Sequence, residues 1–244
     1  MPTFIGDVHG WIDRLNHILQ QEPTGPYIFL GDLIDRGPDS KAVITKVREL
    51  CEGGLAQCVM GNHEYALVRS LGCPELGISP DLSLYARWLD LYRGIKTCKS
   101  FGVTNGDPNE LRVALGSNLL WLAKLPWIIK TKHRYQGKNY SYLAVHAGLR
   151  NDISWKQQYT SLLKFQHCWE TPITPEMYDC LYSKSLIYTV PIDLPHNTIV
   201  ISGHTHLNEV YISENRIICD TSGGLPDFPL SAIQLPDNKI YSAE

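Results

Sequence analysis

The chain has 244 residues, and 22 basic against 25 acidic side chains give it a formal net charge of −3. A sequence pI near 6.3 offers no overall attraction to nucleic-acid backbones or anionic membranes, so any phosphate that the protein handles must be captured locally. A hydrophobic fraction of 43% with 19% charged residues excludes disorder as the main state.

The N-terminus and the cysteines predict a cytoplasmic protein. The opening sequence MPTFIGDVHG has no basic segment before an apolar run, which predicts no signal peptide. No apolar stretch approaches the roughly 18 residues that a transmembrane helix needs, so no membrane partner is expected. The seven cysteines are odd in number and form no CxxC pair, which predicts reduced thiols; they are Cys51, Cys58, Cys73, Cys98, Cys168, Cys180 and Cys219.

The first 70 residues alternate short β-type runs with helical patterns. The runs cover residues 3–5, 27–30 and 58–60, and apolar residues at helical spacing follow each run, around 11–19, 43–51 and 64–70. Asp39 or Ser40 is available to cap the second helix, which Gly53 and Gly54 end. This order predicts parallel strand pairing in an α/β core.

Residues 71–125 are predicted to form a helical insertion over one edge of that core. Leu82, Tyr85, Leu89 and Tyr92 recur at helical spacing, and the segment 107–110 opens another helix that continues to Pro126. Because glycine and proline are spread evenly and no linker stands out, we expect residues 1–244 to form a single domain.

The last third of the chain is β-type again. Short turns between its later runs predict an antiparallel meander. The runs cover residues 142–145, 198–202, 210–212, 216–219, 231–235 and 239–241. The basic residues between positions 130 and 138 are expected to mark a solvated hairpin.

A polar block beside a glycine follows each of five predicted strands. The blocks are GDVHG (6–10), GDLIDRG (31–37), GNHE (61–64), HAGL (146–149) and GHTH (203–206). Turn formation explains any one of them, but turns do not require histidine, so the same pattern at five strand ends indicates a ligand site. The side chains brought together would be Asp7, His9, Asp32, Asn62, His63, His146, His204 and His206.

The chemistry of this set indicates a metal centre. Carboxylates, imidazoles and one amide, without a thiol, suit Mn, Fe or Zn. Six candidate ligands exceed the needs of one tetrahedral ion, and Asp32 is placed to bridge two ions. Two such ions can hold a hydroxide between them and clamp a phosphoryl group, so the residues predict metal-assisted hydrolysis.

The five blocks, in this order over residues 6–206, resemble the signature of the phosphoprotein phosphatase family within the calcineurin-like metallophosphoesterases. The resemblance is closest to small bacterial and phage members, including diadenosine tetraphosphatases. It implies an α/β fold, the metallophosphatase four-layer sandwich, in which two mixed β-sheets are flanked by helices and carry a helical insertion. It also implies two divalent metal ions, with Mn favoured in vitro, and direct attack by a hydroxide that bridges them.

The resemblance also assigns roles to individual residues. His63 would be the general acid, oriented by Asp35 on its other ring nitrogen, and Arg36 would grip the phosphoryl oxygens. Asp32 would bridge the two ions. The other ligands would be, on the first ion, Asp7 and His9 and, on the second ion, Asn62, His146 and His204.

The chain departs from the family pattern in two places. Family members usually present a second phosphate-binding arginine after the HAG block, and the comparable stretch here, residues 181–188, contains none. Lys184 and Arg150 are the candidates to replace it. His206 is the second departure, because phosphoprotein phosphatases generally lack a histidine at this position. It is either a further ligand of the first ion or a histidine that ends a strand.

These residues predict a phosphoric ester hydrolase of the Ser/Thr phosphoprotein phosphatase type, acting on phosphomonoesters. The alternative keeps the chemistry and changes the substrate to a dinucleoside polyphosphate such as diadenosine tetraphosphate. A remote alternative is a catalytically silent interaction module, against which the intact set His63, Asp35 and Arg36 argues. The expected partner is therefore a phosphorylated protein, a small phosphoester or a nucleotide, and the sequence leaves the oligomeric state open.

Overall fold

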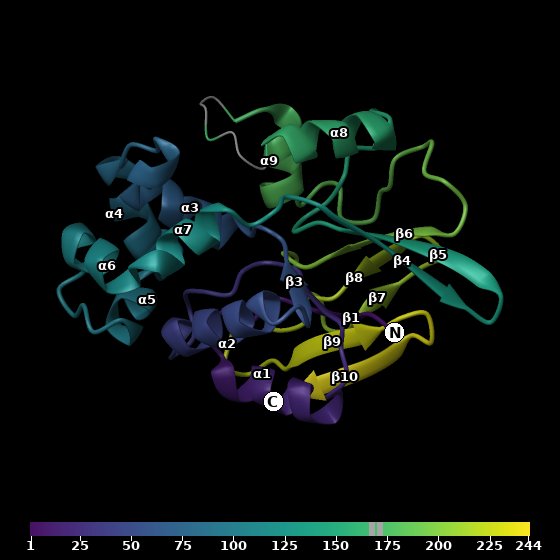
Figure 1. The fold of residues 1–244 in the computed structure, drawn as a ribbon, viewed down its shortest axis with the longest axis horizontal. Coiled ribbons are helices and arrows are strands. Elements are labelled where there is room, and N and C mark those ends of the chain that lie inside the picture. The colour runs from purple at the N-terminus through teal and green to yellow at the C-terminus, as the bar shows by residue number, and fades with distance from the viewer. Residues whose placement is uncertain (166–168, 170–172) are drawn as a thin grey trace.

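Two facing β-sheets with helices on their outer sides make up the fold (Figure 1). The computed structural model describes residues 1–165, 169 and 173–244. Each sheet has five strands and contains both parallel and antiparallel pairs, as the predicted mixed-sheet sandwich requires.

The first sheet has the strand order β10-β9-β1-β2-β3. Its strands are β1 (Thr3–Ile5), β2 (Tyr27–Phe29), β3 (Ala56–Cys58), β9 (Leu230–Gln234) and β10 (Lys239–Ala243). β1, β2 and β3 pair in parallel, as predicted, and helices α1 (Ile12–Gln21) and α2 (Ser40–Glu52) connect them. The Asp39 side chain caps α2 by accepting a hydrogen bond from the Ala42 backbone N–H. The third strand lies two residues earlier than the predicted 58–60.

The second sheet has the order β4-β5-β6-β8-β7. Its strands are β4 (Ile129–Tyr135), β5 (Lys138–Ala144), β6 (Thr198–Ser202), β7 (Tyr211–Ile212) and β8 (Arg216–Ile218). The predicted antiparallel meander is wrong, because β8 pairs in parallel with β6 and the chain then crosses to β9 in the other sheet. The turn residues correctly mark the β7/β8 and β9/β10 reversals, but local turn chemistry does not determine which sheet the next strand joins.

The space between the sheets is filled by the inner faces of both. Phe4 and Leu30 from the first sheet meet Tyr142 and Ile201 from the second in one apolar cluster. Within each sheet the neighbouring parallel strands end at nearly the same level, since Ile5 pairs with Phe29 and Ala144 pairs with Ile201. The loops that follow these strands therefore leave the sandwich along one edge.

The chain between β3 and β4 is helical and gathers at one end of the molecule (Figure 1). Its elements are α3 (Asn62–Leu71), a 3₁₀ turn (Pro74–Leu76), α4 (Leu82–Leu91), α5 (Ile95–Ser100), α6 (Pro108–Leu115) and α7 (Ser117–Ala123). The single helix predicted from Pro108 onward is interrupted at Gly116, where φ is +53°. Glycine adopts that angle without strain, so it separates α6 from α7.

Two further helices, α8 (Trp155–Phe165) and α9 (Pro175–Tyr182), lie over the second sheet (Figure 1). In the part of the chain that the structure describes, no helix is both long and apolar enough to span a bilayer. The six cysteines in that part have free thiols, as predicted, and Cys168 lies outside the described residues. The single-domain organisation stays a prediction.

Candidate metal and phosphate site

The loops after β1, β2, β3, β5 and β6 converge around Asp32. One oxygen of its carboxylate lies 3.5 Å from His9 Nε2, and the other lies 3.4 Å from His146 Nε2. The side chain is 3% exposed. A buried carboxylate thus stands between histidines from two different sheets.

The backbone at this edge is strained. Positive φ angles occur at five non-glycine residues of the strand-end blocks, namely His9, Asp32, Asp35, Arg36 and His204. Non-glycine residues hold such angles only where the surrounding structure enforces them, and functional sites are the usual place.

Two positions in the blocks must be glycine because another loop lies against their backbone. A Cβ on Gly61 would lie 2.3 Å from the Asp32 backbone nitrogen, and one on Gly203 would lie 2.0 Å from Asp7 Oδ1. The loops therefore reach contact only because these two positions have no side chain.

Three ligand-type atoms near Asp32 point at one another. Asn62 Oδ1 lies 2.8 Å from His146 Nε2 and 3.1 Å from His204 Nδ1, and the two histidine nitrogens are 3.2 Å apart. The remaining ring nitrogens are held by backbone carbonyls: His146 Nδ1 donates to Leu30 O and His204 Nε2 donates to Tyr182 O. The three atoms face one point, where a cation, either a proton on His146 Nε2 or a metal ion, would satisfy them.

A second cluster lies on the other side of Asp32. His9 Nδ1 donates to Ile34 O at 2.7 Å, and His9 Nε2 is buried without a hydrogen-bond partner. That nitrogen lies 3.5 Å from Asp32 and 4.0 Å from Asp7. Two atoms that each bind one ion at about 2.1 Å lie at most about 4.2 Å apart, so His9 Nε2 could share an ion with either carboxylate. His9, Asp32 and His63 also bring one ligand-type atom each within 4.8 Å of one another.

The electrostatics of the centre also favour cations. Burial raises the pKa of Asp7 well above its usual value. Burial would raise the pKa of Asp32 as well, but the neighbouring His146, His63 and His9 together outweigh burial and hold it well below its usual value. Burial lowers the pKa of His146, yet Asp32 raises it to about 10, whereas burial lowers that of His204 to about 3. The buried carboxylates thus draw positive charge into the site.

His63 and Asp35 form a buried pair beside this centre. His63 Nδ1 donates to Asp35 Oδ2 at 2.7 Å, and Arg36 Nη2 donates to His63 Nε2 at 3.2 Å. His63 Nε2 is also 3.6 Å from Asp32. The guanidinium at this nitrogen disfavours a metal ion there, although His63 lies close enough to His9 and Asp32 to join them as a ligand.

Two residues of the helical segment hold Asp35 in place. Trp88 Nε1 donates to Asp35 Oδ2 at 2.9 Å, and Thr97 Oγ1 donates to Asp35 Oδ1 at 2.6 Å. Burial raises the pKa of Asp35, and the hydrogen bonds from His63, Thr97 and Trp88 oppose that shift. The sequence pattern did not predict Trp88 or Thr97, because each lies at an ordinary buried position of a helix.

Glu64 joins the ends of β2 and β3. Its carboxylate accepts hydrogen bonds from the backbone N–H groups of Asp32, Leu33 and Gly61, at 2.8, 2.8 and 3.1 Å. Burial raises its pKa to about 7. The signal for this role is its place three residues after Gly61, where a glutamate completes a helix capping box.

A cavity of about 370 Å³ opens onto the centre. Asp32, Asn62 and His204 line it, together with Arg36, whose Nη1 donates to Gly223 O at 2.6 Å. His206 also lines it, and its Nε2 is buried without a hydrogen-bond partner beside the Phe228 ring. Both alternatives for His206, a ligand or a strand-end histidine, remain compatible with this position.

The two candidates for a second phosphate-binding cation lie in different places. Lys184 lines the cavity, as does Arg93, which the sequence analysis did not single out. Arg150 lines a different hollow and donates to Asp152 at 2.8 Å and to Asp179 at 3.2 Å. Its charge is therefore already paired away from the metal-ligand cluster.

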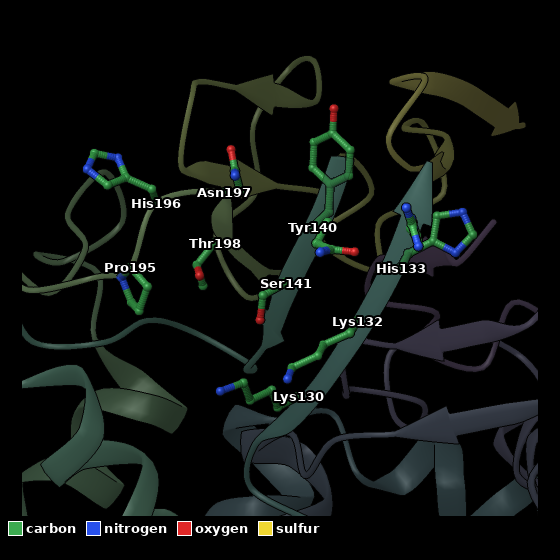
Figure 2. Close-up of a pocket in the computed structure, with 11 residues that line it drawn as sticks. Lys130, Lys132, His133, Tyr140, Ser141, Pro195, His196, Asn197 and Thr198 are labelled. Atoms are coloured by element: carbon green, nitrogen blue, oxygen red, sulfur yellow. The ribbon is translucent and has the colours of Figure 1, made fainter. Parts of the chain in front are cut away.

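A larger groove, about 670 Å³, lies on the second sheet (Figure 2). The predicted β4/β5 hairpin forms one side, with Lys132 and Ser141 paired across it, and the segment from Pro195 to Thr198 forms the other. Lys130 Nζ lies 4.4 Å from the centre of the Trp155 ring. The groove contains none of the strand-end blocks, so it is separate from the candidate metal centre.

Comparison with known proteins agrees with this geometry. The model of the calcineurin-like phosphoesterases matches residues 3–208. The chain belongs to this family. The predicted family is thereby confirmed.

Named relatives and solved structures refine the comparison. A symmetrical bis(5'-nucleosyl)-tetraphosphatase of Ralstonia nicotianae is 40% identical to this calcineurin-like chain over 100 residues. The match covers 36% of the chain and 35% of the relative, so it spans about a third of that protein.

Two solved structures share the fold over nearly the whole chain. One, whose name gives diadenosine tetraphosphatase as a candidate activity, has a TM-score of 0.56 at 21% identity and covers 100% of this chain and 95% of its own. The other, a serine/threonine phosphatase of Saccharomyces cerevisiae, has a TM-score of 0.59 at 14% identity, with coverage of 99% and 79%. At these identities the similarity concerns the fold.

Proposed function

We propose that this chain is a metal-dependent hydrolase of dinucleoside polyphosphates, with diadenosine tetraphosphate as the type substrate. The observation that carries the proposal is Asp32, whose carboxylate is shared by two clusters of ligand atoms while His63 and Arg36 lie beside it. The named activity of the Ralstonia relative supports the substrate class.

The ligand set fits two divalent ions of the Mn, Fe or Zn type. Bound there, they would supply Lewis acidity toward the phosphoryl oxygens and lower the pKa of a water molecule. Asp32 would be shared between the two. The other ligands would be Asp7 and His9 on one side, and Asn62, His146 and His204 on the other.

Arg36 binds the phosphoryl group in this proposal. Its Nη1 donates a hydrogen bond to Gly223 O, and without substrate its Nη2 donates one to His63 Nε2. Phosphoryl oxygens are stronger acceptors for a guanidinium than a neutral imidazole is, so substrate would draw Nη2 away from His63. Binding would thereby free His63 Nε2.

Once it is free, Nε2 takes up a proton from solvent, and His63 donates that proton to the leaving oxygen. Because Nδ1 stays bonded to Asp35, only Nε2 is available for the transferred proton. Asp35 in turn is fixed by Trp88 and Thr97, so the imidazole keeps one orientation while the proton moves.

The Ser/Thr phosphatase interpretation shares all of this chemistry. The yeast phosphatase supports it through the fold alone, whereas the named tetraphosphatase relative supports a dinucleotide substrate. A silent interaction module would have no use for the oriented pair of His63 and Asp35.

A substrate panel tests the proposal. The full chain, loaded with Mn²⁺, is assayed for kcat/KM on diadenosine tetraphosphate and on phosphoserine and phosphothreonine peptides. We expect a large excess for the dinucleotide. Equal or higher values for the peptides would overturn the proposed substrate, and a metal-loaded protein with no turnover on either would support the module.

A further inference from the structure

Three cationic side chains from separate parts of the chain line the 370 Å³ cavity. Arg36 follows β2, Arg93 lies between α4 and α5, and Lys184 follows α9. Arg36 is already engaged by Gly223 and His63. Arg93 and Lys184 are exposed, and among the ion pairs of the described residues neither has a carboxylate partner.

The position of Arg93 is built into the helical segment. Its φ is +58°, a left-handed conformation that glycine or asparagine adopts more readily. The next residue, Gly94, donates its N–H to Trp88 O and packs so closely that a Cβ there would lie 2.5 Å from the Trp88 indole. Since Trp88 also donates to Asp35, the turn that presents Arg93 is tied to the His63 and Asp35 pair.

One phosphoryl group does not use all of these charges. In the proposed function the metal-ligand cluster and Arg36 hold the phosphoryl group that is attacked, while Arg93 and Lys184 at the same cavity have no carboxylate partner among the ion pairs of the described residues. A polyphosphate chain carries further negative phosphates within a few ångströms of the first, and guanidinium and ammonium groups bind such oxygens by charge-assisted hydrogen bonds.

We propose that Arg93 and Lys184 form a second anion subsite, which binds the phosphates of a polyphosphate chain next to the phosphate that is attacked. The proposal rests on the proposed function, because it assigns the extra cations to the same substrate. It predicts that both residues affect KM for polyphosphates, and that Arg93, to which no part in binding the attacked phosphate is assigned, leaves phosphomonoesters nearly unaffected.

The variants Arg93→Ala and Lys184→Ala test it in the full, Mn²⁺-loaded chain. Arg87→Ala is the matched control, because Arg87 is an exposed arginine of α4 that does not line the cavity. For diadenosine tetraphosphate we expect KM to rise about tenfold in each cavity variant, the loss of one charged hydrogen bond. For p-nitrophenyl phosphate we expect kcat/KM of Arg93→Ala to stay within about twofold of the unmodified chain.

A second readout does not depend on dinucleotide hydrolysis. Inhibition of p-nitrophenyl phosphate turnover is measured with inorganic tripolyphosphate and with orthophosphate at equal free Mn²⁺. The subsite predicts that Arg93→Ala raises the inhibition constant of tripolyphosphate about tenfold and leaves that of orthophosphate unchanged. If diadenosine tetraphosphate is not hydrolysed but this difference holds, the proposed function fails and the subsite stands.

Two results would overturn the subsite. One is an equal weakening of tripolyphosphate and orthophosphate, and the other is an Arg93→Ala effect no larger than that of Arg87→Ala. Because Arg93 sits in a strained turn, Arg93→Gln is assayed in parallel, with the melting temperature as a check on folding. Its long polar side chain preserves the local packing while removing the charge.

Discussion

Thr97→Val removes one hydroxyl from the support of Asp35 and keeps the shape of the side chain. In the structure Thr97 Oγ1 donates to Asp35 Oδ1 at 2.6 Å and accepts the Asp35 backbone N–H at 3.0 Å. Both residues are fully buried. The substitution therefore leaves a buried carboxylate oxygen without this donor, while Trp88 and His63 still hold the other oxygen.

The size of the effect follows from the charge on Asp35. A hydrogen bond to a charged group contributes about 1.5–3 kcal/mol to the free energy of unfolding, which in a chain of this length lowers the melting temperature by roughly 3–12 °C. General acid catalysis contributes roughly 10²–10⁴ in rate. Because the other oxygen of Asp35 stays anchored, we expect kcat to fall about tenfold and KM to change little.

The assay compares Thr97→Val in two backgrounds, the unmodified chain and His63→Asn. If Thr97 acts through His63, its effect on kcat disappears once His63 is gone. Thr198→Val is the control, since Thr198 is a buried threonine at the start of β6, far along the strand from His204. A tenfold loss that persists in the His63→Asn background would refute the positioning role.

Three further substitutions test other parts of the site. Asp32→Asn should lower metal content and turnover together, because the carboxylate is shared by both ligand clusters; metal analysis showing two ions still bound would contradict this. His63→Asn should keep the metals yet slow the hydrolysis of an alkyl phosphate by about 10²–10⁴, since a poor leaving group depends on protonation, and unchanged turnover on that substrate would refute the acid role. Glu64→Gln should lower the free energy of unfolding by about 1.5–3 kcal/mol in denaturant titrations, because its new amide would face backbone N–H donors; an unchanged midpoint would argue against the link between β2 and β3.

The strand ends were predictable because their signals are local. An Asp, Asn or His close to a glycine after a short apolar run marks the end of each strand, and parallel strands bring such ends to one edge of the sheet. The distances around Asp32 agree with that prediction, as do the pairings of β1 with β2 and of β5 with β6. The roles of the individual residues stay proposals.

The residues that support the strand ends were not predictable in the same way. Trp88 and Thr97 read in sequence as ordinary core positions of helices, and the partner of both, Asp35, lies 53 and 62 residues away. The direction of an indole N–H depends on how α4 packs against the rest of the fold, which helical periodicity does not contain. The predicted antiparallel meander was wrong for a related reason. A turn signal indicates that the chain reverses, but it does not indicate which sheet the next strand, here β9 after β8, will join.

Anomalous diffraction from crystals grown with Mn²⁺ tests the central claim most directly. We expect two peaks on either side of Asp32, one within ligand distance of His9 Nε2 and the other within ligand distance of His146 Nε2 and His204 Nδ1. A single peak, or peaks that do not contact Asp32, would contradict the two-ion centre and the proposed hydrolysis that depends on it.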